Sequence, residues 1–303
     1  MMDLLEKQIG ENAMFSKYDI FCKVVEFSGF TKAANAIQYS QSAVSQTVKN
    51  LEQELGLTLL TRGKEGIHLT ADGEAIYPYI QAIANAEAAL ARRQREMKGL
   101  NGSIIRIGTF TSVSRTLLPG WIFDFKRTYP EVRFILEQGE YTTISEWVEN
   151  SVVDFGFVNL DAASEMAGRL LYTDEMCAVL PMDHPLTRKQ TVSLRDLAKT
   201  PLILLDEGEF NVPRRAFEAA GLEPRVDYEV YDDYTIIAMV EKKLGVSIMY
   251  ERVLAGYGHQ VATRPIAEDL SRRVGIVWNN WETMPIAARC FVEFILAQDI
   301  ERS

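Results

Sequence analysis

The pattern of apolar and polar positions begins with two short predicted helices, over residues 31–38 and 41–55, separated by a polar turn. The second helix carries one apolar stripe at helical spacing, formed by Val44, Val48, Leu51 and Leu55. Ser40 directly precedes this helix and is a suitable N-cap, because its hydroxyl can accept a hydrogen bond from a backbone N–H of the first turn. The pattern therefore predicts a helix-turn-helix.

The polar face of the second helix is rich in short hydrogen-bonding groups and poor in charge. Its N-terminal part carries Gln41, Ser42, Ser45, Gln46 and Lys49. A helix fits the major groove of DNA, where Gln and Ser side chains can bond to base edges. These residues are therefore candidate DNA contacts, with Lys32 on the preceding helix as a further one. The alternative is an ordinary two-helix corner whose polar face meets only water.

Residues 57–73 predict a β-hairpin after the second helix. Three leucines are expected to be buried: Leu57, Leu59 and Leu60. Arg62 and Lys64 lie beside glycines at the tip, and a short strand resumes at residues 67–70. Basic side chains at such a tip can contact the phosphate backbone, so the hairpin is predicted to be a wing that adds a second DNA contact.

Residues 71–95 predict one long helix, in which Pro78 falls early enough to be tolerated or to produce a kink. A narrow apolar stripe runs along it, formed by Ile76, Ile80, Ile83 and Leu90 with Tyr79 and Ala86. This stripe has too little apolar surface for a domain core, and a helix from a second copy of the chain would bury it. The alternative is a helix that lies on its own chain. The polar, glycine-containing residues 98–103 predict a hinge.

From residue 104 the pattern changes to alternating strands and helices, which is typical of α/β folds with parallel strands and crossover helices. A first set covers residues 104–158, and a second set begins near Leu170. The chain closes with a strand over residues 272–280 and an amphipathic helix over residues 285–299. The fold class is therefore α/β, preceded by a mainly α-helical part.

Four loops of the α/β part are candidate ligand sites, because ligands in open α/β sheets bind beyond the carboxyl ends of strands, beside helix N-termini. The first two loops are rich in hydroxyls and supply the candidates Thr109, Thr111, Ser112, Ser114, Tyr141, Thr142 and Thr143. The other two loops supply Asp206, Asp232 and Tyr234. Hydroxyls suit a carboxylate or a phosphate, although Ser and Thr also serve as ordinary N-caps.

The loops at residues 205–211 and 231–235 are acidic. Their carboxylates come from Asp206, Glu207, Glu209, Asp232 and Asp233. If several of these face the ligand, the ligand is expected to present an amine or another cation on that side. The alternative is that this run of acids forms only a solvated surface.

Several motifs agree, in order and distance, with one protein family. The N-terminal segments GFTKAANAIQYSQSAVSQTVKNLEQELG, LLTR and HLTADG, and later HPLTRKQTVSLRDLAKTPLI and LGVSIMYERVL, resemble LysR-type transcriptional regulators. Two places depart from the family pattern: Ser151 stands where a glycine is usual before the strand, and the motif at residues 244–248 is not followed by proline.

The resemblance implies a winged helix-turn-helix domain at residues 1–73 and a linker and dimerisation helix with its hinge at residues 74–103. Residues 104–303 would form a two-lobed effector-binding domain similar to periplasmic solute-binding proteins. Lobe I would comprise residues 104–162 and 267–303, and lobe II residues 163–266. The implied protein is a regulator that binds double-stranded DNA under the control of a small-molecule effector, self-associates as a dimer or tetramer, and contacts RNA polymerase.

Composition supports a globular chain of 303 residues with 47% hydrophobic residues. The N-terminus lacks the features of a signal peptide, no apolar run approaches the ~20 residues of a transmembrane helix, and three cysteines far apart favour reduced thiols. These features predict a cytoplasmic protein without membrane association. The net charge is −10, and residues 1–98 are nearly neutral, with 11 Lys and Arg against 12 Asp and Glu. DNA affinity should therefore depend on a few placed contacts and on several copies that bind together.

Two other functional classes are weaker. A solute-binding component of a transporter would explain residues 104–303 but not the winged helix, and it would need an export signal. An enzyme on the same bilobal fold would need a catalytic constellation, and the sequence contains no GxSxG, GxxxxGK, HExxH or CxxC motif. No metal or cofactor is predicted.

Overall fold

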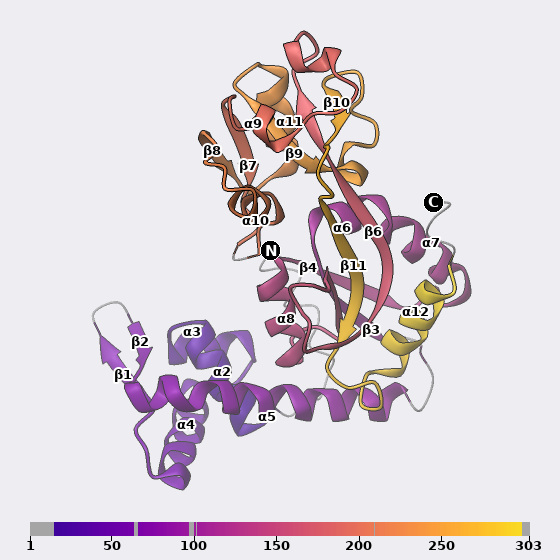
Figure 1. The fold of residues 1–303 in the computed structure, drawn as a ribbon. Helices are drawn as coiled ribbons and strands as arrows, with labels where there is room; N and C mark the ends of the chain where they lie inside the picture. The colour runs from indigo at the N-terminus through magenta and orange to yellow at the C-terminus, as the bar shows by residue number, and fades with distance from the viewer. Residues whose placement is uncertain (1–14, 64–65, 97–99, 101, 209, 299–303) are drawn as a thin grey trace. The chain divides into compact units, whose positions relative to one another are not determined.

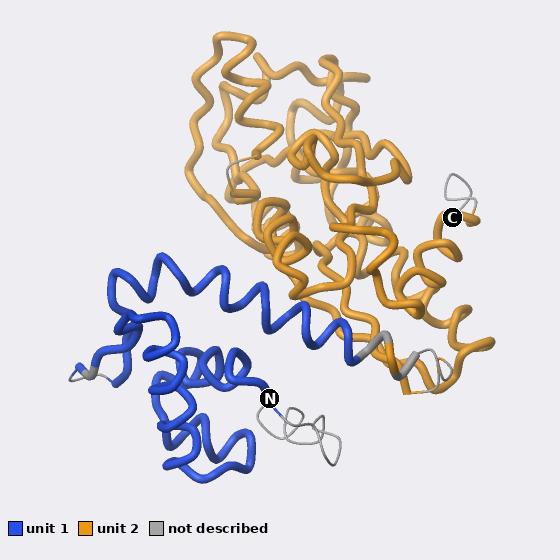
Figure 2. The backbone as a smooth tube through the Cα atoms, turned by 90° about the horizontal axis from the view of Figure 1, so that it is seen from below, with its two compact units in different colours: residues 1–91 blue, residues 92–303 orange. Residues whose placement is uncertain are grey.

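A computed structural model of the protein describes residues 15–63, 66–96, 100, 102–208 and 210–298. The chain divides into two compact units, residues 1–91 and residues 92–303 (Figure 2). Each unit has a hydrophobic core of its own, and the second unit has two. No helix in the described part of the chain is both long and apolar enough to cross a membrane.

The first unit is a bundle of three short helices followed by a two-stranded wing and a long helix (Figure 1). In chain order its elements are α2 (Lys17–Glu26), α3 (Phe30–Ala36), α4 (Gln41–Leu55), β1 (Leu60–Gly63), β2 (Gly66–Leu69) and α5 (Ala71–Glu96). Ala33 and Ala34 are buried where α3 meets α4, because their small side chains allow the helices to approach closely. The predicted helix-turn-helix and wing are therefore both present.

Helix α4 has the N-cap that the sequence predicts, since the Ser40 hydroxyl accepts a hydrogen bond from the backbone N–H of Ala43 at 3.2 Å. Val44, Val48 and Leu51 are buried. Leu55, which the sequence pattern places in the same stripe, is 41% exposed. The helix ends there, because Gly56 adopts a left-handed conformation with φ of +68°. The buried stripe therefore ends one turn earlier than predicted.

The long helix α5 agrees with the helix predicted over residues 71–95, and Pro78 lies within it. Ile80 is buried in the core of the first unit, and Ile76 packs against the same core. Tyr79, Ile83 and Leu90 are instead 69%, 41% and 63% exposed. The predicted stripe is therefore divided: one side of the helix packs on its own chain, and the other side is open to solvent in a single copy.

The second unit is built on one mixed sheet of nine strands. The strands are β3 (Ile104–Thr109), β4 (Arg133–Gln138), β5 (Phe155–Asn159), β6 (Ala167–Leu180), β7 (Leu202–Leu205), β8 (Val226–Val230), β9 (Val246–Tyr250), β10 (Ala262–Pro265) and β11 (Ser271–Trp278). They lie in the order β4-β3-β5-β11-β6-β9-β7-β8, and β10 also pairs with β6. Strand β3 is parallel to β4 and β5, and β7 is parallel to β8 and β9, while β6 and β11 pair antiparallel.

The helices of the second unit connect these strands. They are α6 (Thr111–Thr116), α7 (Leu118–Thr128), α8 (Tyr141–Glu149), α9 (Leu194–Leu197), α10 (Val212–Ala219), α11 (Asp233–Glu241) and α12 (Ile286–Leu296), with 3-10 turns η1 (Pro185–Arg188) and η2 (Glu251–Leu254). Gly156 on β5 shows how closely they pack, because a Cβ atom there would lie 2.5 Å from the Ile144 side chain of α8.

Two lobes share the sheet, and the long strand β6 runs through both (Figure 1). Residues 167–175 of β6 pair with β11 in lobe I, and residues 176–180 pair with β9 and β10 in lobe II. The chain therefore crosses to lobe II in the middle of β6, which corrects the lobe boundary predicted between residues 162 and 163. Strand β6 itself continues across the boundary, so only the strand pairing reveals where one lobe ends and the other begins. The return falls at residues 266–270, between β10 and β11.

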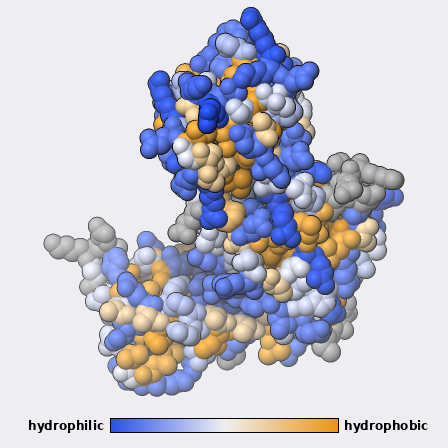
Figure 3. Space-filling model, viewed as in Figure 1, coloured by the Kyte–Doolittle hydropathy of each residue, from blue (hydrophilic) through white to orange (hydrophobic). Residues whose placement is uncertain are grey.

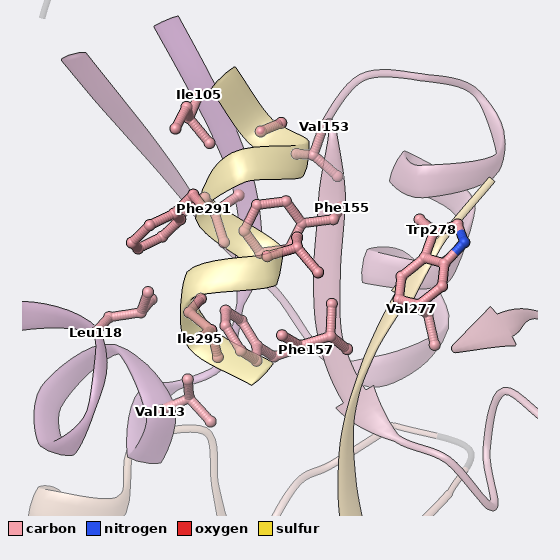
Figure 4. Packing of buried hydrophobic residues seen from close by; sticks show 14 of the residues in the cluster. Ile105, Val113, Leu118, Val153, Phe155, Phe157, Val277, Trp278, Phe291 and Ile295 are labelled. Atoms are coloured by element: carbon pink, nitrogen blue, oxygen red, sulfur yellow. The ribbon is translucent and has the colours of Figure 1, made fainter. Parts of the chain in front are cut away.

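The core of lobe I is dominated by aromatic side chains. Phe155 and Phe157 from β5 pack together with Phe291 and Ile295 from α12 (Figure 4). Burial of each such side chain contributes roughly 1.5–3 kcal/mol to the free energy of unfolding.

On the face of the molecule shown in Figure 3, hydrophilic and hydrophobic residues are interspersed.

Candidate nucleic-acid interface and candidate ligand cleft

The N-terminal part of α4 presents the polar face that the sequence predicts. Gln41, Ser42, Gln46 and Lys49 are exposed, and Ser45 is half-buried. Lys32 on α3 is also exposed. The side-chain amide of Gln46 donates a hydrogen bond to Asn50 Oδ1 at 2.8 Å, so Asn50 belongs to the same polar face although the prediction did not include it. In the free protein these groups bond to water or to one another, and they can exchange those bonds for base edges.

Glu52 of α4 forms hydrogen bonds with the start of the wing. Its carboxylate accepts hydrogen bonds from the backbone N–H groups of Leu59 at 2.7 Å and Leu60 at 3.1 Å, where the hairpin begins. Arg62 lies on β1 opposite Ile67 of β2. Lys64 and the side chain of Arg62 lie outside the described residues.

The second candidate site is a cleft of about 670 Å³ between lobe I and lobe II. It lies where the sequence predicts, at the carboxyl ends of β3, β4, β7 and β8. Six predicted residues line it: Thr111, Ser112, Tyr141, Thr142, Thr143 and Asp206. Other lining residues include Phe110, Glu140, Glu207, Asp233 and Arg272.

Four predicted residues lie outside the lining of this cleft. Thr109 is fully buried, and its hydroxyl donates to the carbonyl of Phe110 at 3.4 Å. Ser114 accepts a hydrogen bond from the Gln138 amide at 2.9 Å. Asp232 is exposed and caps α11, where it accepts from the backbone N–H of Thr235 at 2.8 Å.

Tyr234, the fourth of these residues, belongs to a contact between the lobes. The Arg115 guanidinium of α6 lies 3.5 Å from the centre of its ring. Arg115 also donates a hydrogen bond to the Tyr257 hydroxyl at 3.3 Å. Lobe I is thus held to lobe II by one arginine and two tyrosines, beside the cleft.

Arg272 lies at the base of the cleft and is only 2% exposed. Its Nη2 lies 2.6 Å from Asp174 Oδ2, and Asp174 is equally buried. The guanidinium also donates to the hydroxyls of Ser112 at 2.6 Å and Tyr141 at 2.8 Å. The Tyr141 hydroxyl donates onward to Glu207 Oε1 of lobe II at 3.1 Å. This chain of polar contacts links the two lobes beneath the cleft.

Two buried carboxyl groups of lobe II face the cleft. Burial raises the pKa of Glu207 to about 7, although the charge of Arg272 opposes the shift. Burial likewise raises the pKa of Asp233 to about 6, again against the effect of Arg272. Both groups therefore titrate near neutral pH, and a bound ligand that changes the local charge can change their protonation.

Glu140 occupies the N-terminus of α8 on the lobe I side. Its carboxylate accepts hydrogen bonds from the backbone N–H groups of Thr142 at 2.9 Å and Thr143 at 2.8 Å. Partial burial works against ionisation, but these hydrogen bonds and one from the Thr143 hydroxyl lower the pKa of Glu140. Gly208 of lobe II lies close to this carboxylate, because a Cβ atom on it would be 3.0 Å from Glu140 Oε2.

The prediction missed Arg272, Asp174 and the capping role of Glu140. A signal for Arg272 was present, because side chains alternate along a strand and Arg272 therefore shares the face of the buried Val274. An arginine on that face needs a buried partner. The partner, Asp174, is 98 residues earlier in the chain, and only the pairing of β6 with β11 brings the two together.

A metal centre finds no support in the described part of the chain, where no three His, Cys, Asp or Glu residues lie close enough to hold an ion. The cysteines Cys22, Cys177 and Cys290 are free thiols. Burial raises the pKa of Cys22 to about 12, as expected for a cysteine that serves in packing.

Comparison with known proteins covers both units. The family model described as "LysR substrate binding domain" matches residues 98–299, and the model described as "Bacterial regulatory helix-turn-helix protein, lysR family" matches residues 15–74. The uncharacterized HTH-type transcriptional regulator YvbU of Bacillus subtilis (strain 168) is 31% identical over 277 residues, which are 90% of this chain and 94% of that protein.

Two further similarities extend this result. The transcriptional dual regulator GltC of Bacillus subtilis (strain 168) is 30% identical, over 84% of this chain and 87% of that protein. The crystal structure of full-length CbnR complexed with the target DNA has a TM-score of 0.67 at 21% identity, over 94% of this chain and 99% of that chain. The second of these similarities concerns the fold alone.

Proposed function

The chain belongs to the LysR family of bacterial transcriptional regulators, and we propose that it reads DNA with the N-terminal part of α4 and binds its effector in the cleft between lobes I and II. Members of this family are DNA-binding regulators with an effector-binding domain, and not enzymes. The observation that carries the proposal is the exposed, hydrogen-bonding face of α4 beside a wing.

Within this proposal, residues 1–73 are the DNA-binding domain, residues 74–103 the linker helix and hinge, and residues 104–303 the effector-binding domain. Gln41, Ser42, Ser45 and Gln46 face the bases. Lys32, Lys49, Arg62 and Lys64 face the phosphates, where they fix the register of the protein on DNA. The short neutral side chains suit base edges, while the few cations limit non-specific affinity.

Self-association follows from α5. Its exposed Tyr79, Ile83 and Leu90 recur at helical spacing and offer an apolar face to a second copy. Two DNA-binding domains that act together raise the effective concentration of each at its half-site, which offsets weak binding by one domain. An effector that shifts the lobes would change the placement of these domains and, through them, contact with RNA polymerase in the cytoplasm.

The first experiment is a selection of random duplex DNA with the purified full-length protein at moderate salt, followed by sequencing of the bound pool. We expect one enriched, roughly palindromic motif with half-sites about one helical turn, or a multiple of it, apart. The control is a variant with Gln41, Ser45 and Gln46 replaced by Ala, which should give no such motif. A motif that persists unchanged in this variant would show that another surface reads the bases.

A further inference from the structure

The cleft is lined by more negatively charged side chains than positively charged ones. Four carboxylates line it: Glu140, Asp206, Glu207 and Asp233. The only cationic side chain among the described lining residues is Arg272. A ligand that binds there therefore meets an excess of negative charge, unless the protein already compensates each of these groups.

Arg272 is already engaged by the protein. Two of its nitrogens, Nε and Nη2, donate to Asp174 Oδ2, and its other hydrogen bonds go to the hydroxyls of Ser112 and Tyr141. Its planar group also lies 3.5 Å from the centre of the Tyr250 ring and 4.7 Å from that of Phe110. A carboxylate ligand would have to displace Asp174 or share a cation whose charge Asp174 already balances.

The N-terminus of α8 is occupied as well. Free backbone N–H groups at a helix N-terminus are a common anion site. Here the Glu140 carboxylate accepts from Thr142 and Thr143 and fills that position. The protein thus supplies its own anion at the place where an anionic ligand would otherwise bind.

The opposite side of the cleft is compensated less: the charge of Arg272 favours ionisation of its two carboxyl groups, but the hydrogen bonds of Arg272 go to Asp174, Ser112 and Tyr141. Asp233 is 5% exposed, and no other residue in the described chain donates a hydrogen bond to its carboxylate. Glu207 is 6% exposed and accepts a hydrogen bond from the Tyr141 hydroxyl at 3.1 Å. A buried carboxylate with few hydrogen-bond donors is unfavourable, and a cation placed against it lowers that penalty.

We propose that the effector of this cleft is a cation, an alkylamine or a guanidine, whose charged group lies against the carboxylates of Asp233 and Glu207. This assignment rests on the proposed function of the cleft as the effector site. The Thr111 hydroxyl can then donate a hydrogen bond to the rest of the ligand or accept one from it. The Thr143 hydroxyl, which donates to Glu140, can only accept one. Both carboxyl groups must ionise to pair with the cation, so binding releases protons and the affinity rises as the pH increases through about 6 to 7.

The test uses the full-length protein and compounds of matched size. Saturation-transfer NMR would compare n-butylamine, 1,4-diaminobutane and butylguanidine with butyrate, succinate and 1-butanol. Each compound is measured with the native protein, Asp233→Asn, Glu207→Gln and Glu241→Gln. Glu241 is an exposed carboxylate at the other end of α11 and serves as the matched control. Circular dichroism tests whether each variant is folded. If Glu207→Gln does not fold, the comparison of Asp233→Asn with the native protein decides whether the ligand is a cation.

We expect at least one amine or guanidine to bind the native protein and Glu241→Gln equally, and to bind Asp233→Asn roughly tenfold or more weakly. The inference is overturned if no cationic compound gives a signal that depends on Asp233, or if butyrate or succinate binds the cleft more tightly than the amines. The DNA selection separates the two proposals. A protein that enriches a DNA motif but prefers carboxylates keeps the proposed function and loses this inference.

Discussion

The face of α4 and the base of the cleft present polar groups in opposite ways. On α4, Gln46 and Lys49 are exposed to solvent. In the cleft, Arg272 and Asp174 are each 2% exposed and bound to one another. Exposed groups contribute little to folding and remain available to a partner, whereas buried charges must be compensated within the fold. Substitutions in the cleft should therefore change stability, and substitutions on α4 should change binding alone.

The largest effect is expected at Arg272. Arg272→Met leaves the Asp174 carboxylate buried without its cation, which should lower the free energy of unfolding by about 3–5 kcal/mol. Urea unfolding of the full-length protein, followed by circular dichroism, measures this. The neighbouring Arg273 is the matched control, because its side chain is half-exposed and pairs with Asp161 at 3.2 Å. Arg273→Met should change stability by less than about 1 kcal/mol. Equal effects of the two substitutions would remove the distinction between buried and exposed sites.

A stabilising substitution is expected at Asp233. Its pKa rises from 3.8 to about 6 on folding, so the folded protein holds this proton more tightly than the unfolded chain does. The resulting stability is fully present below pH 4 and is lost as the pH rises through 6. Asp233→Asn removes the ionisation and should stabilise the ligand-free protein at pH 8 by up to about 3 kcal/mol. Melting curves between pH 5 and 8 test this, with Glu241→Gln as the control.

The opposite result at Asp233 would be informative. If Asp233→Asn lowers the melting temperature at pH 8, the carboxylate is compensated in the free protein, and the cleft is less unfavourable to anions than its charges indicate. Because Asn keeps nearly the same shape as Asp, a change of this sign could not be attributed to a cavity.

Patterns among neighbouring residues were sufficient to predict the helices and strands of the fold. The spacing of Val44, Val48 and Leu51 and the capping residue Ser40 are properties of neighbouring residues, and both appear in the structure. The strand-and-loop pattern also brought together Thr111, Tyr141 and Asp206, which all line the cleft.

The interior of the cleft could not be predicted in the same way. Arg272 pairs with Asp174 across two strands, and Tyr141 meets Glu207 across two lobes. Nothing in the local pattern specifies either partner. The crossing within β6 was missed for the same reason, because it depends on which strands pair and not on the residues of β6 alone. Features that depend on neighbouring residues are therefore predicted from the sequence, whereas contacts between residues far apart in the chain are not.

On α4 the expected effect is on recognition. Gln46→Ala should reduce discrimination between the selected motif and its single-base variants by about 1–3 kcal/mol at one position, because a base contact is lost. Gln53→Ala is the matched control: Gln53 is an exposed glutamine on the same helix, seven residues later and farther from the groove-facing end. Both variants should unfold at the same urea concentration as the native protein. A lower midpoint for Gln46→Ala would mean that this face also supports the fold.

The smallest effect is expected at the wing. Arg62→Ala removes one predicted phosphate contact, so it should weaken binding to all duplexes by the same factor and leave the preferred motif unchanged. The loss of a phosphate contact is recognised by the salt dependence of binding. The slope of log affinity against log salt should become shallower by about one unit, because one fewer counterion is released. Arg127→Ala, which removes an exposed charge from α7 of the second unit, should leave the slope unchanged. If Arg62→Ala instead alters the selected motif while the slope stays constant, the wing reads bases, and the division between reading by α4 and anchoring by the wing is wrong.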